Sequence, residues 1–361
     1  MRMIDDYNIE STFLGHIASF YYVRHSTAAY FNDNIIPNMN LIDLIKLISY
    51  AKEFEEIPLR HNEDNYNEAL AKICPYRPPD KRYDSSNLKT FLLFQMYFGR
   101  LPPPIRDYVT DAKLVIDGSM RIAMALIDIA ADKGYLSVVF NLCHIMQMIA
   151  QGMWIHDSQF LNIPHFNETI IKILHSKENI TYLPQLIDLV KNGELQSTFK
   201  KHKINLSEEN IQDIEECIKY IPDVSFKVGI CAFDSEKFEP IRGNYFLKTH
   251  FKFIDGQLQP GGEALLKISL KRLNSQYPLT VRMERYSKIK DAGWWIVVAN
   301  EAKQELMCVK KITFKDTLRK EFQINLPESF EESPKIDVYL VSDSYIGIDQ
   351  IYSIRFNKSK N

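Results

Sequence analysis

Polar side chains at helical spacing are the first feature of this sequence that could do chemistry. His144, Gln147 and Gln151 follow one another at intervals of three and four residues, so they share one face of an otherwise apolar helix predicted over 136–154. Imidazole and amide groups both donate and accept hydrogen bonds, which lets them contact nucleic-acid bases or backbone. The alternative is that neighbouring helices satisfy them inside the protein. The sequence leaves both interpretations open.

A second polar group is the stretch RHNED, which contains Arg60, His61, Glu63 and Asp64. One interpretation is a helix start, with Asn62 as the N-cap and the two acids at the positive end of the helix dipole. The other is a polar contact to a neighbouring domain.

Two further motifs point to structural roles. The run GWWIVV places Trp294 and Trp295 on opposite faces of a predicted strand, so one of them is expected to face a core and the other to face outward. The run DSYIGIDQ predicts a hydrogen-bonded corner between the last two strands, tied by Tyr345 with Asp343 and Asp349.

The motifs of an independent enzyme are missing from the sequence. It contains no GxxxxGK[ST], GxGxxG, HExxH or GxSxG pattern, and its histidines are scattered. Its five cysteines form no CxxC pair and have no histidine at zinc-finger spacing, so neither a zinc site nor a disulfide framework is expected. We therefore expect no catalytic activity of the chain alone, no cofactor and no metal.

Composition narrows the class of protein. The 361 residues, 45% hydrophobic and 25% charged, are typical of a globular chain of two or three domains. Residues 225–361 carry 22 basic and 17 acidic side chains, or +5, which leaves −7 for residues 1–224 and a total of −2. The small total gives no argument from bulk charge for a nucleic-acid or membrane partner. No signal peptide is predicted, because the start MRMIDDYNIESTF carries acids where an apolar run would stand. No membrane span is predicted, because the longest apolar-rich stretch, 136–154, contains polar residues.

The predicted secondary structure changes from helices to strands near residue 222. Before it, apolar residues recur at helical period and predict helices over 14–28, 41–51, 62–74, 87–100, 105–133, 136–154, 167–175, 181–190 and 207–220. After it, alternation predicts strands at 225–233, 246–254, 264–273, 279–286, 293–300, 305–314, 319–326, 335–342 and 351–357. Short strands separated by turn residues suggest a β-sandwich of immunoglobulin or fibronectin type III kind.

Several longer motifs, in order along nearly the whole chain, resemble a known family: LGHIASFYYVRHSTAAYF, EFEEIPLRHNED, FLLFQMYFGRLPPP, IDIAADKGYL, IMQMIAQGMWIHDSQFLNIPHF, GWWIVV and VSDSYIGIDQ. They resemble the Sec-63 homology unit that follows the helicase cassettes of large superfamily-two helicases. The stretches PLRHNEDNYNEALAK and YLPQLIDLV look nearer to the activating signal cointegrator branch than to the spliceosomal branch. The endoplasmic-reticulum translocation branch is not favoured, since the sequence has no HPD motif of a J-domain.

The resemblance implies a multidomain fold, α then β. Its expected parts are a helical bundle with a long ratchet-like helix over 1–158, a helix-loop-helix over 159–222 and a fibronectin type III-like sandwich over 223–361. It also implies a non-catalytic C-terminal accessory unit of an ATP-dependent RNA or DNA helicase, located in the nucleus, the cytoplasm or both. The expected partners are the helicase lobes of the parent chain, a single strand of RNA or DNA and protein subunits of a larger complex, with no membrane. The chain is expected to be a C-terminal piece of that parent, and a protein-interaction scaffold in pre-mRNA splicing is the alternative.

Overall fold

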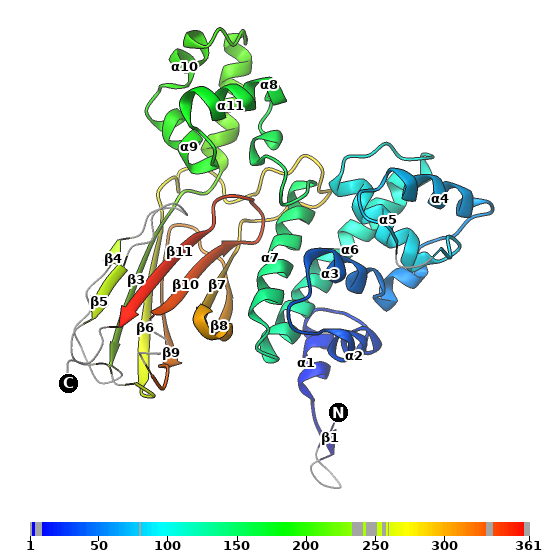
Figure 1. The fold of residues 1–361 in the computed structure, drawn as a ribbon, viewed down its shortest axis with the longest axis horizontal. Helices are drawn as coiled ribbons and strands as arrows, with labels where there is room; N and C mark the ends of the chain where they lie inside the picture. Colours follow the sequence, from blue (N-terminus) through cyan, green and yellow to red (C-terminus); the bar gives the residue numbers. More distant parts are fainter. Residues whose placement is uncertain are drawn as a thin grey trace. The chain divides into compact units, whose positions relative to one another are not determined.

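The helices and strands divide between two compact units. The computed structural model describes residues 2–3, 9–78, 81–232, 241–242, 251–254, 258, 260–329 and 335–356. The first unit comprises residues 1–155 with 284–288, and the second comprises 156–283 with 289–361. The first is mainly helical, and the second combines helices with two larger sheets (Figure 1). The fold is therefore mixed α and β, with helices preceding most of the strands.

The first unit is built around two long neighbouring helices, α6 and α7. Gly134, with a φ of 73°, ends α6, and α7 begins two residues later. Such a short turn makes consecutive helices antiparallel neighbours. The helices of this unit are α1 (Phe13–Phe20), α2 (His25–Asn34), α3 (Leu41–Ser49), the 3-10 helix η1 (Lys52–Glu56), α4 (Glu63–Ile73), α5 (Ser86–Phe98), α6 (Asp107–Asp132) and α7 (Leu136–Gln151), preceded by the strand pair β1 (Arg2–Met3) and β2 (Ile9–Glu10).

The helix predicted over 14–28 is wrong, because the chain forms two helices there. Tyr22 adopts a left-handed φ of 53° after α1, and the Val23 amide donates to the Ala18 carbonyl at 3.0 Å. That hydrogen bond is the closing bond of a Schellman cap, which ends a helix. The helical spacing of apolar residues continued across the break and so hid it.

The second unit contains four α-helices at one end of its sheets (Figure 1). They are preceded by a 3-10 helix, η2 (Gln159–Asn162), and comprise α8 (Glu168–Glu178), α9 (Leu183–Lys191), α10 (Leu195–Lys201) and α11 (Glu208–Tyr220). Ser207 caps α11, since its hydroxyl accepts from the Asn210 amide at 3.1 Å. The short α10 was not predicted, and no side chain caps its first turn.

Two sheets make up the rest of the second unit. One has the order β4–β3–β6–β9 and the other β5–β11–β10–β7–β8, with all pairs antiparallel except β5 with β11. The strands are β3 (Val224–Ala232), β4 (Ile241–Arg242), β5 (Phe251–Ile254), β6 (Glu263–Arg272), β7 (Trp294–Asn300), β8 (Glu305–Ile312), β9 (Thr317–Asn325), β10 (Lys335–Ser342) and β11 (Gln350–Phe356).

The strand predicted at 279–286 is wrong, because only a single bridge, Thr280 to Asp291, forms there. Of the strand predicted at 246–254, residues 246–250 lie outside the described part. None of the described helices is long and apolar enough to cross a membrane.

One hydrophobic core runs through the second unit. Phe226 of β3 packs edge-on against Tyr352 of β11, with ring centroids 5.0 Å apart, which joins the two sheets. The same buried cluster includes Leu174 and Phe199 from the helices. Helices and sheets of this unit are therefore packed together, and a separate domain over 159–222 stays a prediction.

Candidate functional site

The three polar residues of α7 lie on a helix whose side chains are nearly all buried. Gln147 is fully buried, Gln151 is 9% exposed and His144 is half-buried. Burial lowers the pKa of His144, because the charged imidazolium loses water, so this histidine is neutral near pH 7. A neutral imidazole and two amides offer hydrogen bonds without charge.

The end of α7 depends on a glycine. Gly152 has a φ of 59°, and its amide donates to the Met148 carbonyl at 2.8 Å. A Cβ at this position would lie 2.8 Å from Cδ of Arg285. Glycine is therefore required both by the left-handed backbone and by the close approach of residues 284–288.

The RHNED stretch leads into a buried ion network inside the first unit. Arg60 donates to Glu63 Oε1 at 2.7 Å and makes a two-pronged contact with Asp111 at 2.7 and 3.1 Å. Lys89, fully buried on α5, donates from Nζ to Glu63 Oε2 at 2.6 Å, to Asp111 Oδ2 at 2.7 Å and to the Pro58 carbonyl at 2.7 Å. Three acceptors satisfy the three donors of the ammonium group.

Electrostatics of this network favour the ionised forms of both acids. Burial pushes the pKa of Glu63 upward, but hydrogen bonds from Lys89 and Arg60 outweigh it and leave the pKa below its ordinary value. The pKa of Asp111 is likewise raised by burial and brought lower overall by Arg60 and Lys89. The network is a fully paired structural cluster rather than a proton donor or acceptor.

The sequence prediction captured half of this network. Arg60 and Glu63 were singled out, whereas Lys89 and Asp111 were not, because they come from α5 and α6 and only tertiary packing brings them in. Asn62 precedes α4 as expected, but its φ is 63° and its side chain makes no capping hydrogen bond. The interpretation of Asn62 as a side-chain cap is therefore wrong. His61 and Asp64 are exposed, and a contact of the stretch with a neighbouring domain stays a prediction.

Both tryptophans of GWWIVV are buried, which corrects the expectation of an outward one. Trp294 and Trp295 are each 2% exposed. Trp294 belongs to the core between the sheets, and Trp295, on the other face of β7, lies beneath the Lys311 ammonium at 5.6 Å. Burial of both faces of the strand could not be read from alternation.

The DSYIGIDQ corner is held by side-chain to backbone hydrogen bonds. Asp343 accepts from the Gly293 amide at 2.9 Å, Asp349 accepts from the Ser342 amide at 2.6 Å, and the Tyr345 hydroxyl accepts from the Arg282 amide at 3.0 Å. All three side chains tie loop backbone to the ends of strands. The geometry is that of a structural corner.

Metal chemistry finds no support in the described residues, where His, Cys, Asp and Glu nowhere gather into a group able to hold an ion.

The chain thus combines a helical unit, built around the long helices α6 and α7, with a second unit of helices and two larger sheets. The chain belongs to the Sec63 Brl domain family, whose sequence profile matches residues 11–355. This confirms the resemblance read from the motifs.

Relatives of the chain are helicases or subunits of larger complexes. It is 33% identical over 352 residues to the DExH-box ATP-dependent RNA helicase DExH14 of Arabidopsis thaliana, with 97% of this chain and 15% of that protein covered. It is 30% identical to the activating signal cointegrator 1 complex subunit 3 of Rattus norvegicus, with 99% and 17% covered. It is 24% identical to the human U5 small nuclear ribonucleoprotein 200 kDa helicase, with 96% and 15% covered. The chain thus spans about one sixth of the length of these relatives.

Proposed function

We propose that this chain is a non-catalytic accessory unit of an ATP-dependent nucleic-acid helicase of the activating signal cointegrator type. The observation that carries the proposal is that the whole chain aligns with one sixth of proteins named as helicases or as a cointegrator subunit. In this role the unit guides a nucleic-acid strand and docks partner proteins while other parts of the parent hydrolyse ATP. The activity of the parent belongs to this proposal.

Guidance of the strand is assigned to His144, Gln147 and Gln151 of α7. Their groups can contact nucleic acid without demanding one sequence, as a translocating motor requires. Their burial in this structure supports the competing role in packing. Replacement of all three by Ala separates the two roles. If the residues contact nucleic acid, the variant keeps nearly the same free energy of unfolding, and the reconstituted parent helicase unwinds more slowly. If the residues pack inside the protein, the replacement lowers the free energy of unfolding by more than about 2 kcal/mol.

A titration of fluorescent single-stranded RNA tests the accessory role directly. Phosphate contacts make affinity fall steeply with salt, so binding at low salt that weakens tenfold or more at high salt supports strand guidance. Affinity unchanged by salt, or no binding at all, would leave only protein docking.

Contact with the helicase lobes of the parent is supported by α1. Phe13 and Phe20 on this helix are 45% and 65% exposed, and His16 stacks on Phe20 with ring centroids 6.0 Å apart. Exposed aromatic side chains at helical spacing form a face suited to packing against another domain. Phe20→Ser is expected to weaken association with separately expressed helicase lobes without lowering the melting temperature.

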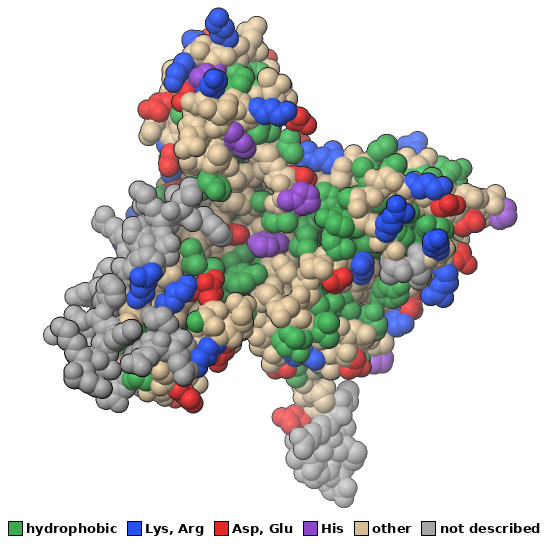
Figure 2. Space-filling view, in the orientation of Figure 1, with side chains coloured by type: hydrophobic (Ala, Val, Ile, Leu, Met, Phe, Trp, Pro, Cys, Tyr) green, Lys and Arg blue, Asp and Glu red, His purple; other side chains and the backbone are tan. Residues whose placement is uncertain are grey.

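A second candidate function is a protein-interaction scaffold, as in a splicing helicase. The strand orders β3–β6–β9 and β8–β7–β10–β11 support a fibronectin type III-like sandwich, a fold common in interaction domains. Figure 2 shows Lys and Arg interspersed with Asp and Glu on the drawn face of the bundle, which gives no continuous track for phosphates there. The excess of five positive charges in residues 225–361 favours an acidic protein surface as the partner.

A further inference from the structure

A pocket of about 670 Å³ lies in the first unit, and His144, Gln147 and Gln151 of α7 are not among its lining residues. Its walls come from the end of α5, the 101–103 connection, the first half of α6 and residues 284–288, called here the strap. All its lining residues belong to the first unit. The volume is within the range of binding pockets, roughly 300 to 1,000 Å³.

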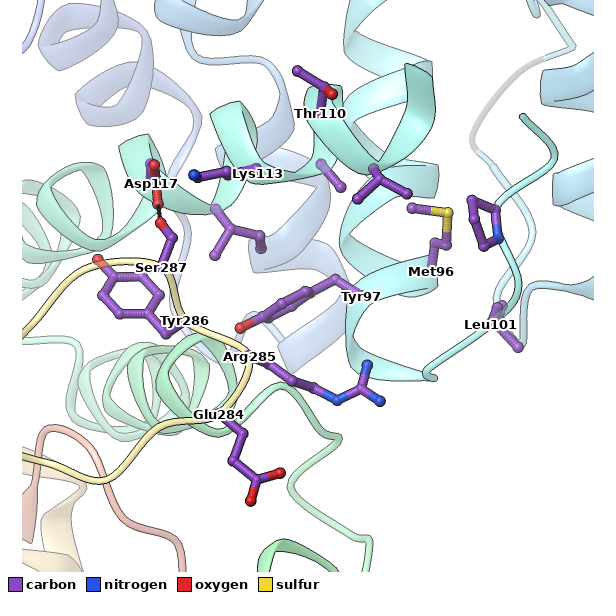
Figure 3. A pocket seen from close by; sticks show the side chains of 14 residues that line it. Met96, Tyr97, Leu101, Thr110, Lys113, Asp117, Glu284, Arg285, Tyr286 and Ser287 are labelled. Carbon is purple, nitrogen blue, oxygen red and sulfur yellow. Dashed lines mark hydrogen bonds between the residues drawn. The ribbon is translucent and has the colours of Figure 1, made fainter. Parts of the chain in front are cut away.

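The strap is anchored, so the pocket is preformed. Ser287 donates a hydrogen bond to the Asp117 carboxylate (Figure 3). Lys288 Nζ donates to the Asp117 carbonyl at 2.9 Å. Tyr286 is 9% exposed and Arg285 approaches Gly152 closely. Binding therefore does not require ordering of this wall, which removes part of the usual entropy cost.

One part of the pocket lining is apolar. Met96, Leu101, Pro103, Val109 and Ile116 line it, and Val109 is 54% exposed although it sits on a helix. An exposed aliphatic side chain beside such a hollow fits an apolar side chain from outside. These aliphatic side chains offer no hydrogen bonds to a ligand.

Two cations approach the pocket from opposite walls. Lys113 comes from α6 and Arg285 from the strap (Figure 3). Both are exposed, and neither makes an ion pair to the residues that the structure describes. Of the two acids, Asp117 is hydrogen-bonded by Ser287, and Glu284 extends away from α5 and α6 (Figure 3). The lining thus holds as many acids as cations, and Lys113 and Arg285 are the two groups in it that can pair with a carboxylate from outside.

Stacking of bases does not fit this pocket. Tyr286 is nearly buried, and Tyr97 is half-buried with its hydroxyl held by the Ile149 carbonyl at 2.9 Å, so neither ring is fully exposed. Single-stranded nucleic acid is typically held by exposed aromatic faces on which successive bases stack, and both tyrosines of the pocket are at least half-buried. A peptide supplies both an apolar side chain and adjacent carboxylates.

We propose that this pocket docks a linear segment of a partner protein, with one apolar side chain inserted beside Val109 and neighbouring Asp or Glu residues paired with Lys113 and Arg285. The inference goes beyond the proposed function, because it holds whether or not the chain touches nucleic acid. Buried apolar anchors supply most of the affinity of such contacts, and charges at the rim set the preference.

The test uses the whole chain and a library of random short peptides displayed on phage. The wild-type chain is the bait and Val109→Asp the counter-selection, with Leu114→Asp as the matched control. Leu114 is on the same helix and is also 54% exposed, but it does not line the pocket. Melting temperatures of both variants are measured first, and both exposed sites are expected to tolerate Asp.

The expected result is enrichment of peptides with a large apolar residue next to Asp or Glu. Synthetic copies should bind the wild type and Leu114→Asp alike, and Val109→Asp at least about tenfold more weakly. The double variant Lys113→Glu with Arg285→Glu should no longer bind these peptides and should prefer copies in which Lys replaces the acidic residues. The proposal is overturned if no peptide is enriched over the counter-selected variant, or if the enriched peptides share no acidic residue. It is also overturned if Val109→Asp and Leu114→Asp bind the peptides equally well. Loss of RNA rather than peptide binding in Val109→Asp would overturn it as well.

Discussion

At the scale of single residues, two positions join backbone conformation to packing. Gly152 ends α7 in a left-handed conformation directly against the strap, and Gly134 ends α6 in the same conformation with open space around it. Gly152 is required by its backbone conformation and by the close approach of the strap, whereas Gly134 is required by its backbone conformation alone. Substitution at the two sites therefore separates the contributions.

Gly152→Ala is expected to destabilise the first unit more than Gly134→Ala. Both variants place a side chain in the left-handed region, at a cost of about 1 kcal/mol. Only the Cβ at 152 also meets Arg285, 2.8 Å from its Cδ. Urea unfolding measures both, and equal losses would show that the strap yields freely to the extra methyl group.

Trp294→Ala and Trp295→Ala are both expected to lower stability, because both indoles are 2% exposed. A large cavity in the core should cost about 3 to 5 kcal/mol for Trp294. Trp295→Ala is expected to cost on the order of 3 kcal/mol by the same reasoning. Tyr22→Ala, at an 86% exposed site, is the control with little change. An unchanged melting temperature for either tryptophan variant contradicts its burial.

At the scale of elements, the buried ion network links the start of α4 to α5 and α6. Each acid lies within hydrogen-bond distance of both cations, and the Lys89 ammonium also lies 4.8 Å from the centre of the Tyr108 ring. The network therefore sets the relative position of three helices. Loss of the network should therefore destabilise the packing of all three helices.

Lys89→Met is expected to destabilise the chain by about 3 to 5 kcal/mol, because two buried carboxylates lose their buried partner. Lys72→Met is the control, since Lys72 pairs with Glu68 on the surface of α4 and such pairs contribute about 0 to 1 kcal/mol. Chemical unfolding of both variants provides the comparison. Similar losses for the two would show that Lys89 is not buried as described.

The same acids make stability depend on pH. The pKa values of Glu63 and Asp111 are lowered by folding, so the unfolded chain binds more protons and stability rises with pH through this window. Their contribution is complete above the ordinary values of 4.5 and 3.8 and is lost as pH falls through the lowered values. Denaturation curves at several pH values, for the wild type and for Glu63→Gln with Asp111→Asn, measure it. The double variant should be less stable at neutral pH and should show a smaller loss on acidification.

At the scale of the whole molecule, two units of different composition follow each other along the chain. The strap returns from the second unit's sequence to the first unit, where it forms one wall of the pocket. A segment remote in sequence thus completes a surface of the bundle.

The isolated chain is expected neither to bind nor to hydrolyse ATP, because its sequence contains no motif that cradles phosphates. Equilibrium dialysis with ATP and a phosphate-release assay, with and without RNA, measure this. The chain joined to its helicase lobes serves as the positive control. ATP turnover by the pure chain above a mock-purified blank would remove the accessory interpretation.

The sequence alone determined the order of element types, most helix and strand positions and the family. Apolar periodicity is local, so α3 to α9 and seven strands followed from it within a few residues. Tertiary structure decided the rest. The break between α1 and α2 depends on the left-handed conformation of Tyr22. The burial of Trp295 depends on what covers the second face of β7. The buried ion network depends on Lys89 and Asp111, which come from helices distant in sequence from Arg60 and Glu63. The pocket exists because Ser287 and Lys288 meet Asp117 across about 170 residues, a contact that no local pattern encodes.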